Sequence, residues 1–248
     1  YYRRITDHFE LNIQLFEKVL DILSKAHNAA KQTLEFEHQQ GASLFQINTS
    51  KGTYFTKNVT IATGFFDLAA TLNVPGEELP KVSHYFKEAH YYSGQKLAVI
   101  GASNSAIDAA LACYRKGAHV SLIIRGAEVG PRVKYWVRPD IENRIKEGSI
   151  KAYFNSEIVR IEQHVVEINT PEGPHTLEND FVLAMTGYQP PFDFMKELGI
   201  QFQSDEFHTP VYNDQTMESS VPNLFLAGVV CGGLKTNKWF IENSRVHA

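Results

Sequence analysis

The chain has 248 residues, of which 43% are hydrophobic and 21% are charged, and its formal net charge is −4. This composition excludes a disordered or collagen-like protein, and the length suits one large domain or two interleaved ones. The acidic balance disfavours a general nucleic-acid-binding protein, which would carry a basic surface. The two cysteines, Cys113 and Cys231, exclude a disulfide framework, a C-x-x-C pair and a cysteine-based zinc site, and they indicate a reducing, cytoplasmic location.

The sequence carries no sign of membrane insertion or secretion. The longest apolar stretch, Leu224–Leu234, is too short to span a bilayer, and residues 1–4 lack the apolar core of a signal peptide. The ten histidines show neither H-x-x-x-H nor H-x-H spacing, so we predict no metal site. Because the chain starts without Met and in what reads as the middle of an element, we expect it to be a fragment.

The first third of the chain predicts a helix, a strand and a β-meander. Residues 1–21 read as mostly helix and then strand. Ser43–Thr49 alternates between apolar and polar residues, Lys51-Gly52 makes a turn, and Thr53–Ile61 continues as a strand. Residues 65–95 contain several breakers and are predicted to be loop-rich.

Residues 96–125 predict a β-α-β unit. Lys96–Ile100 is a short apolar strand, Gly101–Ala106 is a turn of small residues, and Ser105–Lys116 has a helical pattern. Gly117 is a good helix-ending residue, and Val120–Ile124 reads as a second buried strand. This order is typical of a parallel sheet with crossover helices, so the fold class is α/β.

The pattern continues beyond this unit. A helix opens at Pro139 and ends at Gly148, and Ile150–Phe154 reads as a third strand. Residues 158–177 alternate around a turn, which is typical of an antiparallel meander, and Phe181–Met185 reads as a buried strand.

The turn Gly101-Ala102-Ser103-Asn104-Ser105-Ala106 matches the dinucleotide fingerprint G-x-G-x-x-A except at Ser103. The first glycine makes a tight turn, the second lets backbone approach a pyrophosphate, and the helix N-terminus presents free N–H groups to the anion. An α/β turn without a ligand is the plainer alternative. The residues predicted to bind the cofactor here are Gly101, Ala102, Ser103, Asn104 and Ser105.

The strand that follows ends in a basic residue, which favours NADPH over NADH. An NAD site usually has an acid at this point, whereas here Arg125 follows the strand, with Arg132 and Lys134 nearby. The guanidinium of Arg125 offers planar donors that suit a 2′-phosphate, and we predict that Lys134 assists it. Glu128 lies further along the loop, and a solvated basic loop is the alternative interpretation.

Three stretches place glycine directly after a buried strand. Two of them, Ile61-Ala62-Thr63-Gly64 and Ala184-Met185-Thr186-Gly187, flank the β-α-β unit on either side. The third lies late in the chain at Val221–Val229, and we predict a helix after it from about Thr236 to Arg245.

Together these features resemble the thioredoxin-reductase-like flavoproteins, and within them the bacillithiol-disulfide reductase family. The late strand of thioredoxin-reductase-like flavoproteins usually reads A-G-D. Here Val229 stands in place of the Asp, and this also fits the bacillithiol-disulfide reductase family. The similarity runs through nearly the whole chain. It is carried by residues 85–90, residues 104–111, Ala184-Met185, Gly187-Tyr188 and Phe240-Ile241-Glu242-Asn243.

The resemblance implies a Rossmann-like, three-layer NADPH-binding domain at 94–190, inserted into a partial FAD-binding domain at 1–93 and 191–248. It implies an enzyme that passes a hydride from NADPH to FAD and then to a low-molecular-weight disulfide, with no catalytic residue assigned. It also implies a homodimer. The residues expected to line FAD, or to lie at the crossing between domains, are Thr63, Gly64, Gly187, Gly228 and Val229.

The resemblance also bears on how well this chain alone can hold FAD, and the two cysteines are interpreted from their sequence neighbours. The family's N-terminal glycine-rich FAD unit has no counterpart here, so we expect FAD to bind weakly or not at all to this chain alone. Cys113 is expected to be a small core residue, and Cys231 is either structural or redox-active. A flavin monooxygenase and an NADP-binding module without catalysis are the alternative functions.

Overall fold

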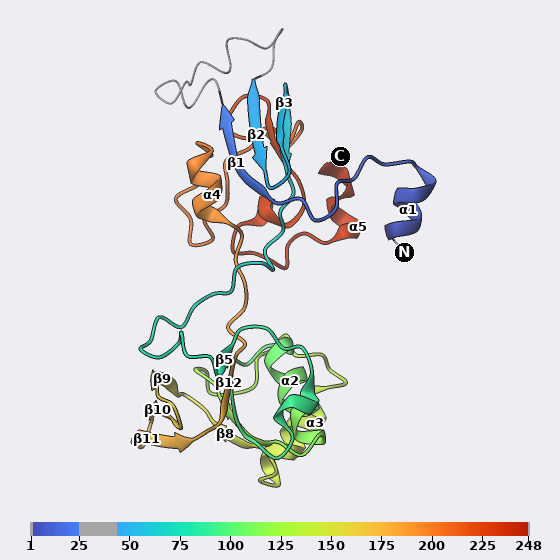
Figure 1. Cartoon of the computed structure of the whole chain (residues 1–248). Coiled ribbons are helices and arrows are strands. Elements are labelled where there is room, and N and C mark those ends of the chain that lie inside the picture. The colour runs from blue at the N-terminus through green and yellow to red at the C-terminus, as the bar shows by residue number, and fades with distance from the viewer. Residues whose placement is uncertain (1, 25–43, 248) are drawn as a thin grey trace. The chain divides into compact units, whose positions relative to one another are not determined.

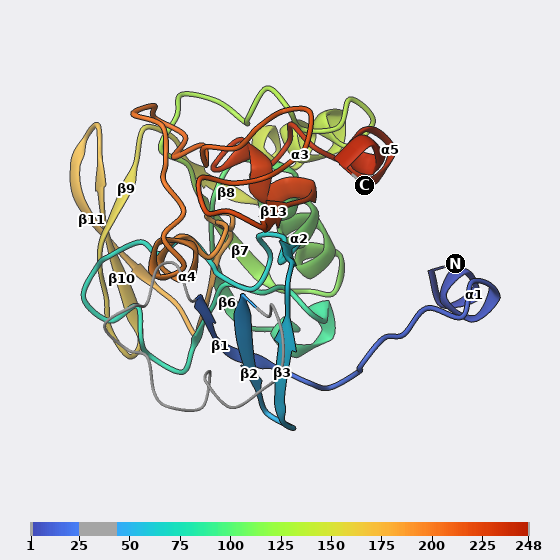
Figure 2. The same ribbon diagram turned by 90° about the horizontal axis from the view of Figure 1, so that it is seen from above.

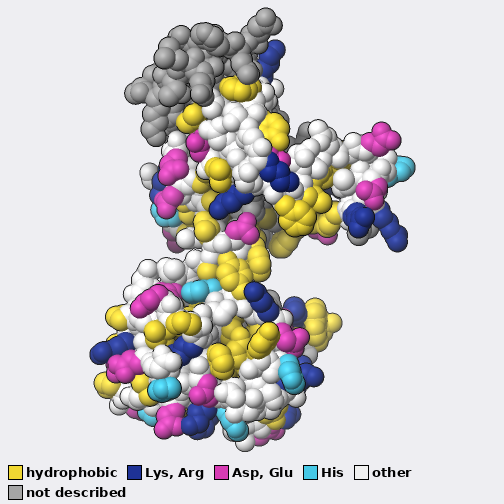
Figure 3. All heavy atoms as spheres, viewed as in Figure 1, with side chains coloured by type: hydrophobic (Ala, Val, Ile, Leu, Met, Phe, Trp, Pro, Cys, Tyr) yellow, Lys and Arg dark blue, Asp and Glu magenta, His cyan; other side chains and the backbone are white. Residues whose placement is uncertain are grey.

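The computed structural model describes residues 2–24 and 44–247, and its contacts divide the chain into two compact units (Figure 1). One unit, here called the inserted unit, is Ala69–Tyr188. The other, here called the split unit, combines Tyr1–Leu68 with Gln189–Ala248. Among the described residues no helix is long and apolar enough to cross a bilayer, since the longest has 12 residues. On the face shown in Figure 3, acidic and basic side chains are interspersed.

The inserted unit is built on a five-stranded sheet in which every neighbouring pair is parallel. The third and fourth strands in the sheet order are joined by helix α2 (Asn104–Arg115), which confirms the predicted β-α-β unit. In sheet order the strands are β5 (Val82–Ser83), β12 (Phe181–Ala184), β6 (Lys96–Ile100), β7 (His119–Ile123) and β8 (Lys151–Tyr153).

The sheet lies between two different layers, which gives the predicted three-layer α/β fold (Figure 1). Helices α2 and α3 (Arg138–Lys146) cover one face together with the 3-10 turn η3 (Ala89–Tyr92). An antiparallel meander covers the other face. Its strands are β9 (Glu157–Ile161), β10 (Val165–Thr170) and β11 (Gly173–Glu178).

Side-chain alternation along the strands explains why both faces of the sheet are covered. In β6, Leu97 and Val99 pack into the core under the helices, while Ala98 and Ile100 pack into the core under the meander. All four are buried. A parallel strand buried on both faces needs an unbroken apolar run, and this is the pattern that the sequence shows.

Residues 69–93 pack with the inserted unit, although the sequence prediction placed the boundary at 93/94 and the second one at 190/191. The reason is non-local pairing. Strand β5 joins the parallel sheet beside β12, and the carbonyl of Pro75 accepts the Ile161 N–H at 2.9 Å. A loop-rich sequence does not reveal such contacts.

The two chain connections between the units run side by side. The N–H of Ala70 donates to the carbonyl of Gly187 at 2.9 Å, and the N–H of Gln189 donates to that of Leu68 at 2.9 Å. Ala69 and Tyr188 form an antiparallel bridge between these two bonds.

In its described residues, the split unit contains two small sheets. One is antiparallel and holds β1 (Val19–Ser24), β2 (Phe45–Thr49) and β3 (Thr53–Thr56), which lie side by side in Figures 1 and 2. The other pairs β4 (Val59–Ile61) in parallel with β13 (Leu224–Leu226). The remaining elements are α1 (Tyr2–His8), α4 (Phe192–Glu197), α5 (Ile241–Ser244), η4 (Gly228–Gly232) and η5 (Arg245–His247).

The prediction of one strand from Thr53 to Ile61 was wrong. The Thr56 hydroxyl donates to the Asn58 carbonyl at 3.0 Å and accepts the Asn58 N–H at 3.4 Å. This local turn ends β3, so β4 joins a different sheet. The predicted start of the meander at Ser43 lies outside the described residues.

The last helix is also shorter than the predicted span from Thr236 to Arg245. The side chain of Asn243 accepts the N–H of Phe240 at 2.6 Å and donates to the carbonyl of Lys238 at 3.0 Å. These bonds cap the chain at Phe240, so α5 begins at Ile241.

Two glycines of the inserted unit provide a matched test of packing. Gly76 and Gly148 have φ of +85° and +78°, but a Cβ on Gly76 would lie 1.8 Å from the Ile161 carbonyl oxygen, whereas one on Gly148 would meet nothing within 4 Å. Gly148→Ala should therefore lower the free energy of unfolding by roughly 1–2 kcal/mol, from backbone strain alone. Gly76→Ala should cost about 1–3 kcal/mol more, measured by urea denaturation followed by circular dichroism. Equal losses would contradict this packing.

Candidate dinucleotide-binding site

The turn after β6 is held so tightly that only glycine fits at its start. Gly101 has φ +133°, and a Cβ there would lie 2.6 Å from the carbonyl oxygen of Met185 at the end of β12. The Gly101 N–H donates to the Ile123 carbonyl at 3.0 Å, so the turn is also tied to β7. Backbone can approach a ligand closely at this point.

Helix α2 starts directly behind the turn with groups that suit an anion. Ser103 is the N-cap residue, with φ −94° and ψ 179°, and its side chain makes no capping hydrogen bond. The first N–H groups of a helix have no partner within it and carry the positive end of its dipole. Ser103 and Ser105 are exposed, so a phosphate can reach both the hydroxyl groups and the helix end.

Asn104, predicted to bind cofactor, uses its side chain to position the loop after β7. Its amide donates to the Arg132 carbonyl at 3.0 Å and accepts the Lys134 N–H at 2.9 Å. Gly130, which the sequence analysis missed, holds the same loop: its N–H donates to the Ala102 carbonyl at 2.9 Å, and a Cβ there would lie 2.6 Å from that oxygen. The short spacing of Gly126 and Gly130 was the available signal.

A cavity of about 610 Å³ runs along the carboxyl ends of the parallel strands. This edge is where open α/β sheets bind ligands, at the strand from which the order reverses, here β6. The wall beyond β7 and β8 includes Ser156 and Glu157, which the sequence analysis did not select because the β8–β9 connection has no motif. The full lining is Ala70, Thr71, Leu72, Val74, Ile100, Gly101, Ala102, Ser103, Ile123, Arg125, Gly126, Ser156, Glu157, Ile158, Met185 and Thr186.

The two predicted basic residues lie in different surroundings. Arg125 lines the cavity, is exposed, and forms no ion pair with any residue that the structure describes. Lys134 is outside the lining, and its ammonium pairs with the Asp108 carboxylate of α2 at 2.8 Å. The guanidinium of Arg125 is therefore the better placed of the two to meet a phosphate in the cavity.

The residues predicted to line a flavin gather at one end of the parallel pair β4–β13. Thr63 and Gly64 follow β4, and Gly228 and Val229 follow β13, where the Ala227 N–H donates to the Ile61 carbonyl at 3.0 Å. The two glycines have φ of +69° and +76°, and a Cβ on either would meet nothing within 4 Å. This open backbone fits the close approach of a planar group.

Two details of this region were not expected from the sequence. The Gly228 N–H donates to Nδ1 of His247 at 3.0 Å. Helix α5 has only four residues, so it offers no dipole of the kind expected for a longer helix. Gly187 belongs to the inserted unit, where its carbonyl accepts the Ala70 N–H.

Both cysteines are buried free thiols. Cys113 lies in the core under the helices, which confirms its predicted role as a small core residue. Cys231 lies in the core of the split unit, with Sγ 3.8 Å from His247 Nδ1. Burial raises the pKa of each thiol to about 11. Within the described ranges no three His, Cys, Asp or Glu side chains are grouped to hold a metal ion.

Comparison with known proteins places these features in a family. The family profile described as pyridine nucleotide-disulphide oxidoreductase matches residues 1–228. The chain is 42% identical over 204 residues to the bacilliredoxin reductase Bdr of Bacillus subtilis (strain 168), a match covering 82% of this chain and 63% of that protein. The chain thus spans less than two thirds of this curated relative.

Solved structures agree with this result. The bacillithiol disulfide reductase Bdr from Staphylococcus aureus is 37% identical, with a TM-score of 0.88 over 100% of this chain and 72% of that chain. The thioredoxin reductase of T. acidophilum is 20% identical, with a TM-score of 0.63 over 94% of this chain and 75% of that chain. At 20% identity the likeness shows the fold alone.

The cysteine pKa values give a prediction with a definite sign. The folded chain keeps both thiols protonated up to about pH 11, whereas the unfolded chain releases these protons near the ordinary value of 9.0. The stability they contribute is fully present below pH 9 and is lost as the pH rises towards 11. At pH 8, alkylation of both thiols should be about 100-fold slower in the folded chain than in urea. Rapid labelling of folded Cys231 would contradict this.

Proposed function

The chain belongs to the pyridine nucleotide-disulphide oxidoreductase family, and we propose that it acts as a flavin-dependent oxidoreductase using NADPH, FAD and a low-molecular-weight disulfide. When bound, NADPH supplies a hydride that FAD passes on to the disulfide, which takes up two electrons and two protons to give two thiols. The observation that carries the proposal is the cavity along the carboxyl edge of the parallel sheet, with the Gly101 turn at its centre and Arg125 in its wall.

Each part of this cavity has a role in holding the nicotinamide cofactor. The Gly101 turn, the Ser103 hydroxyl and the first N–H groups of α2 bind the pyrophosphate, because they combine close approach with positive charge density. Arg125 binds the 2′-phosphate through its guanidinium. Met185 and Thr186, which follow β12, also line the cavity.

In the split unit, the turns at Thr63-Gly64 and Gly228-Val229 line FAD. Support comes from their adjacency at the ends of β4 and β13 and from the open space above both glycines. His247 holds the Gly228 amide and so fixes the conformation of the second turn. Gly187 marks the return of the chain from the inserted unit.

The proposal also covers the substrate, the cellular location and the oligomeric state. Relatives with 42% and 37% identity carry the names bacilliredoxin reductase and bacillithiol disulfide reductase, so we assign a small thiol disulfide of the bacillithiol type as the substrate. Two free, buried thiols fit a reducing compartment such as the cytoplasm. We expect a homodimer.

Arg125→Ala tests the cofactor assignment. A charged hydrogen bond to the 2′-phosphate is worth roughly 1.5–3 kcal/mol, so the ratio of NADPH to NADH affinity should fall about 10- to 100-fold. Lys134→Ala, which removes a side chain paired with Asp108, should change the ratio much less. Fluorescence titration with both nucleotides measures it. An unchanged ratio in Arg125→Ala would show that the guanidinium does not recognise the phosphate.

The reaction itself separates this function from the two alternatives. Anaerobic mixing of NADPH with the protein in the presence of excess FAD should bleach the flavin absorbance, and bacillithiol disulfide should restore it with release of two thiols per disulfide. A flavin monooxygenase would instead consume oxygen with NADPH and release no thiol. An NADP-binding module would bind NADPH without bleaching any flavin.

A further inference from the structure

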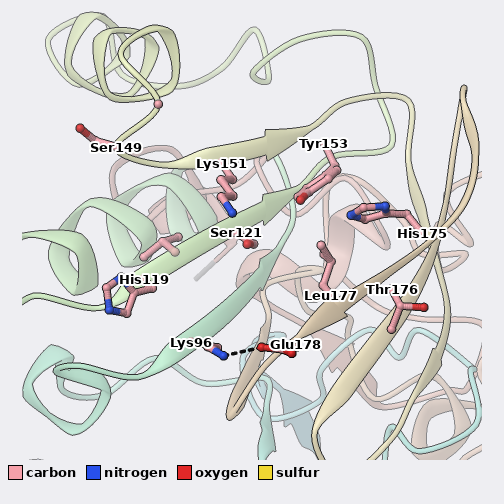
Figure 4. A pocket seen from close by; sticks show the side chains of 12 residues that line it. Lys96, His119, Ser121, Ser149, Lys151, Tyr153, His175, Thr176, Leu177 and Glu178 are labelled. Carbon is pink, nitrogen blue, oxygen red and sulfur yellow. Dashed lines mark hydrogen bonds and ion pairs between the residues drawn. The ribbon is translucent and has the colours of Figure 1, made fainter.

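A second cavity lies at the opposite edge of the parallel sheet, between the amino ends of its strands and the meander (Figure 4). Its volume is about 540 Å³, within the range of small-molecule sites. Its lining is mostly polar and basic, unlike the apolar wall usual for such sites. The lining residues are Lys96, His119, Val120, Ser121, Gly148, Ser149, Lys151, Tyr153, His175, Thr176, Leu177 and Glu178.

The geometry of the sheet brings basic side chains from three adjacent strands to one face. Lys96, His119 and Lys151 are the first residues of β6, β7 and β8. Lys96 is paired with His119, and Ser121 with Lys151. Because the next residues, Leu97 and Val120, point into the core under the helices, these side chains point to the opposite face, towards β11.

The cavity keeps positive charge that no neighbour neutralises. Its one carboxylate, Glu178, pairs with the Lys96 ammonium at 2.5 Å, and the Asp180 carboxylate accepts the Lys96 backbone N–H at 2.8 Å. The charge of Lys96 is thus matched by a carboxylate. The ammonium of Lys151 forms no ion pair with any described residue, and Figure 4 shows it directed towards Ser121 inside the cavity.

Further hydrogen-bond donors line the cavity around Lys151. Tyr153 and His175 face each other across the cavity with ring centroids 5.5 Å apart, one from the parallel sheet and one from the meander (Figure 4). Burial raises the pKa of Tyr153, so its hydroxyl stays protonated and can donate. The hydroxyl of Ser121 and the imidazole of His119 add further donors.

We propose that this cleft binds a small phosphate-bearing anion, with the Lys151 ammonium as its main charged ligand and His119, His175 and the nearby hydroxyls as hydrogen-bond donors. A small anion matches the excess of donors over acceptors and the single unpaired cation. The site is distinct from the nucleotide cavity, because strands of about five residues separate the two edges by roughly 15 Å.

Isothermal titration of the purified chain with orthophosphate, at constant ionic strength, tests the proposal. Lys151→Gln should weaken phosphate binding about tenfold or more, and His175→Gln should weaken it by a smaller factor. Lys146→Gln is the matched control and should bind like the unaltered chain, whereas Arg125→Ala reports any phosphate that is held in the nucleotide cavity instead. Lys146→Gln removes an exposed lysine of α3 outside the cavity, and Arg125→Ala removes the cation of the nucleotide cavity.

Three results would overturn the proposal. The first is no binding of orthophosphate at millimolar concentration. The second is an equal loss in Lys151→Gln and Lys146→Gln, which would indicate a general charge effect. The third is loss of binding in Arg125→Ala with none in Lys151→Gln, which would place the phosphate in the nucleotide cavity. Because no cofactor is present, the outcome does not depend on the proposed enzymatic function.

Discussion

The fit of the Gly101 turn against the Met185 carbonyl is the constraint on which the inserted unit depends. Three strand ends meet there: β6 leads into the turn, the Ile123 carbonyl of β7 accepts the Gly101 N–H, and β12 closes over it. Any side chain at this position would separate β12 from β6. Since α2 begins two residues after Ala102, the same turn also aims the helix N-terminus at the cavity.

The two edges of the parallel sheet, at the carboxyl and the amino ends of its strands, differ in chemistry. Along the middle of the sheet, residues such as Ala98 and Val99 are buried on the two faces, where they pack the layers against the sheet. At the carboxyl edge, glycine and small residues leave room beside Arg125. At the amino edge, the strands begin with Lys96, His119 and Lys151, and the layers separate around polar groups instead of a core. The residue types at the two ends of the strands produce both environments.

The split unit shows how distant segments of the chain are brought together. Strands β4 and β13 lie on either side of the inserted unit in sequence, yet they pair residue for residue, from Val59–Leu224 to Ile61–Leu226. Their glycine turns are therefore brought together at one end. The side-by-side connections at Ala70 and Gly187 allow a whole unit to be inserted without disturbing this pairing.

The sequence by itself determined the β-α-β unit, the meander and the glycine turn, because each depends on periodicity and on residues close together in the chain. Only the tertiary structure decided which strands pair. The break at Thr56, the pairing of β4 with β13 and the packing of Pro75 on Ile161 depend on contacts between distant residues. The same holds for side-chain partners. In the sequence Lys134 and Arg125 are two basic residues of one loop, but in the structure α2 places Asp108 beside Lys134, whereas Arg125 faces a cavity. Local pattern specifies elements, whereas partner choice follows from the packing of the folded chain.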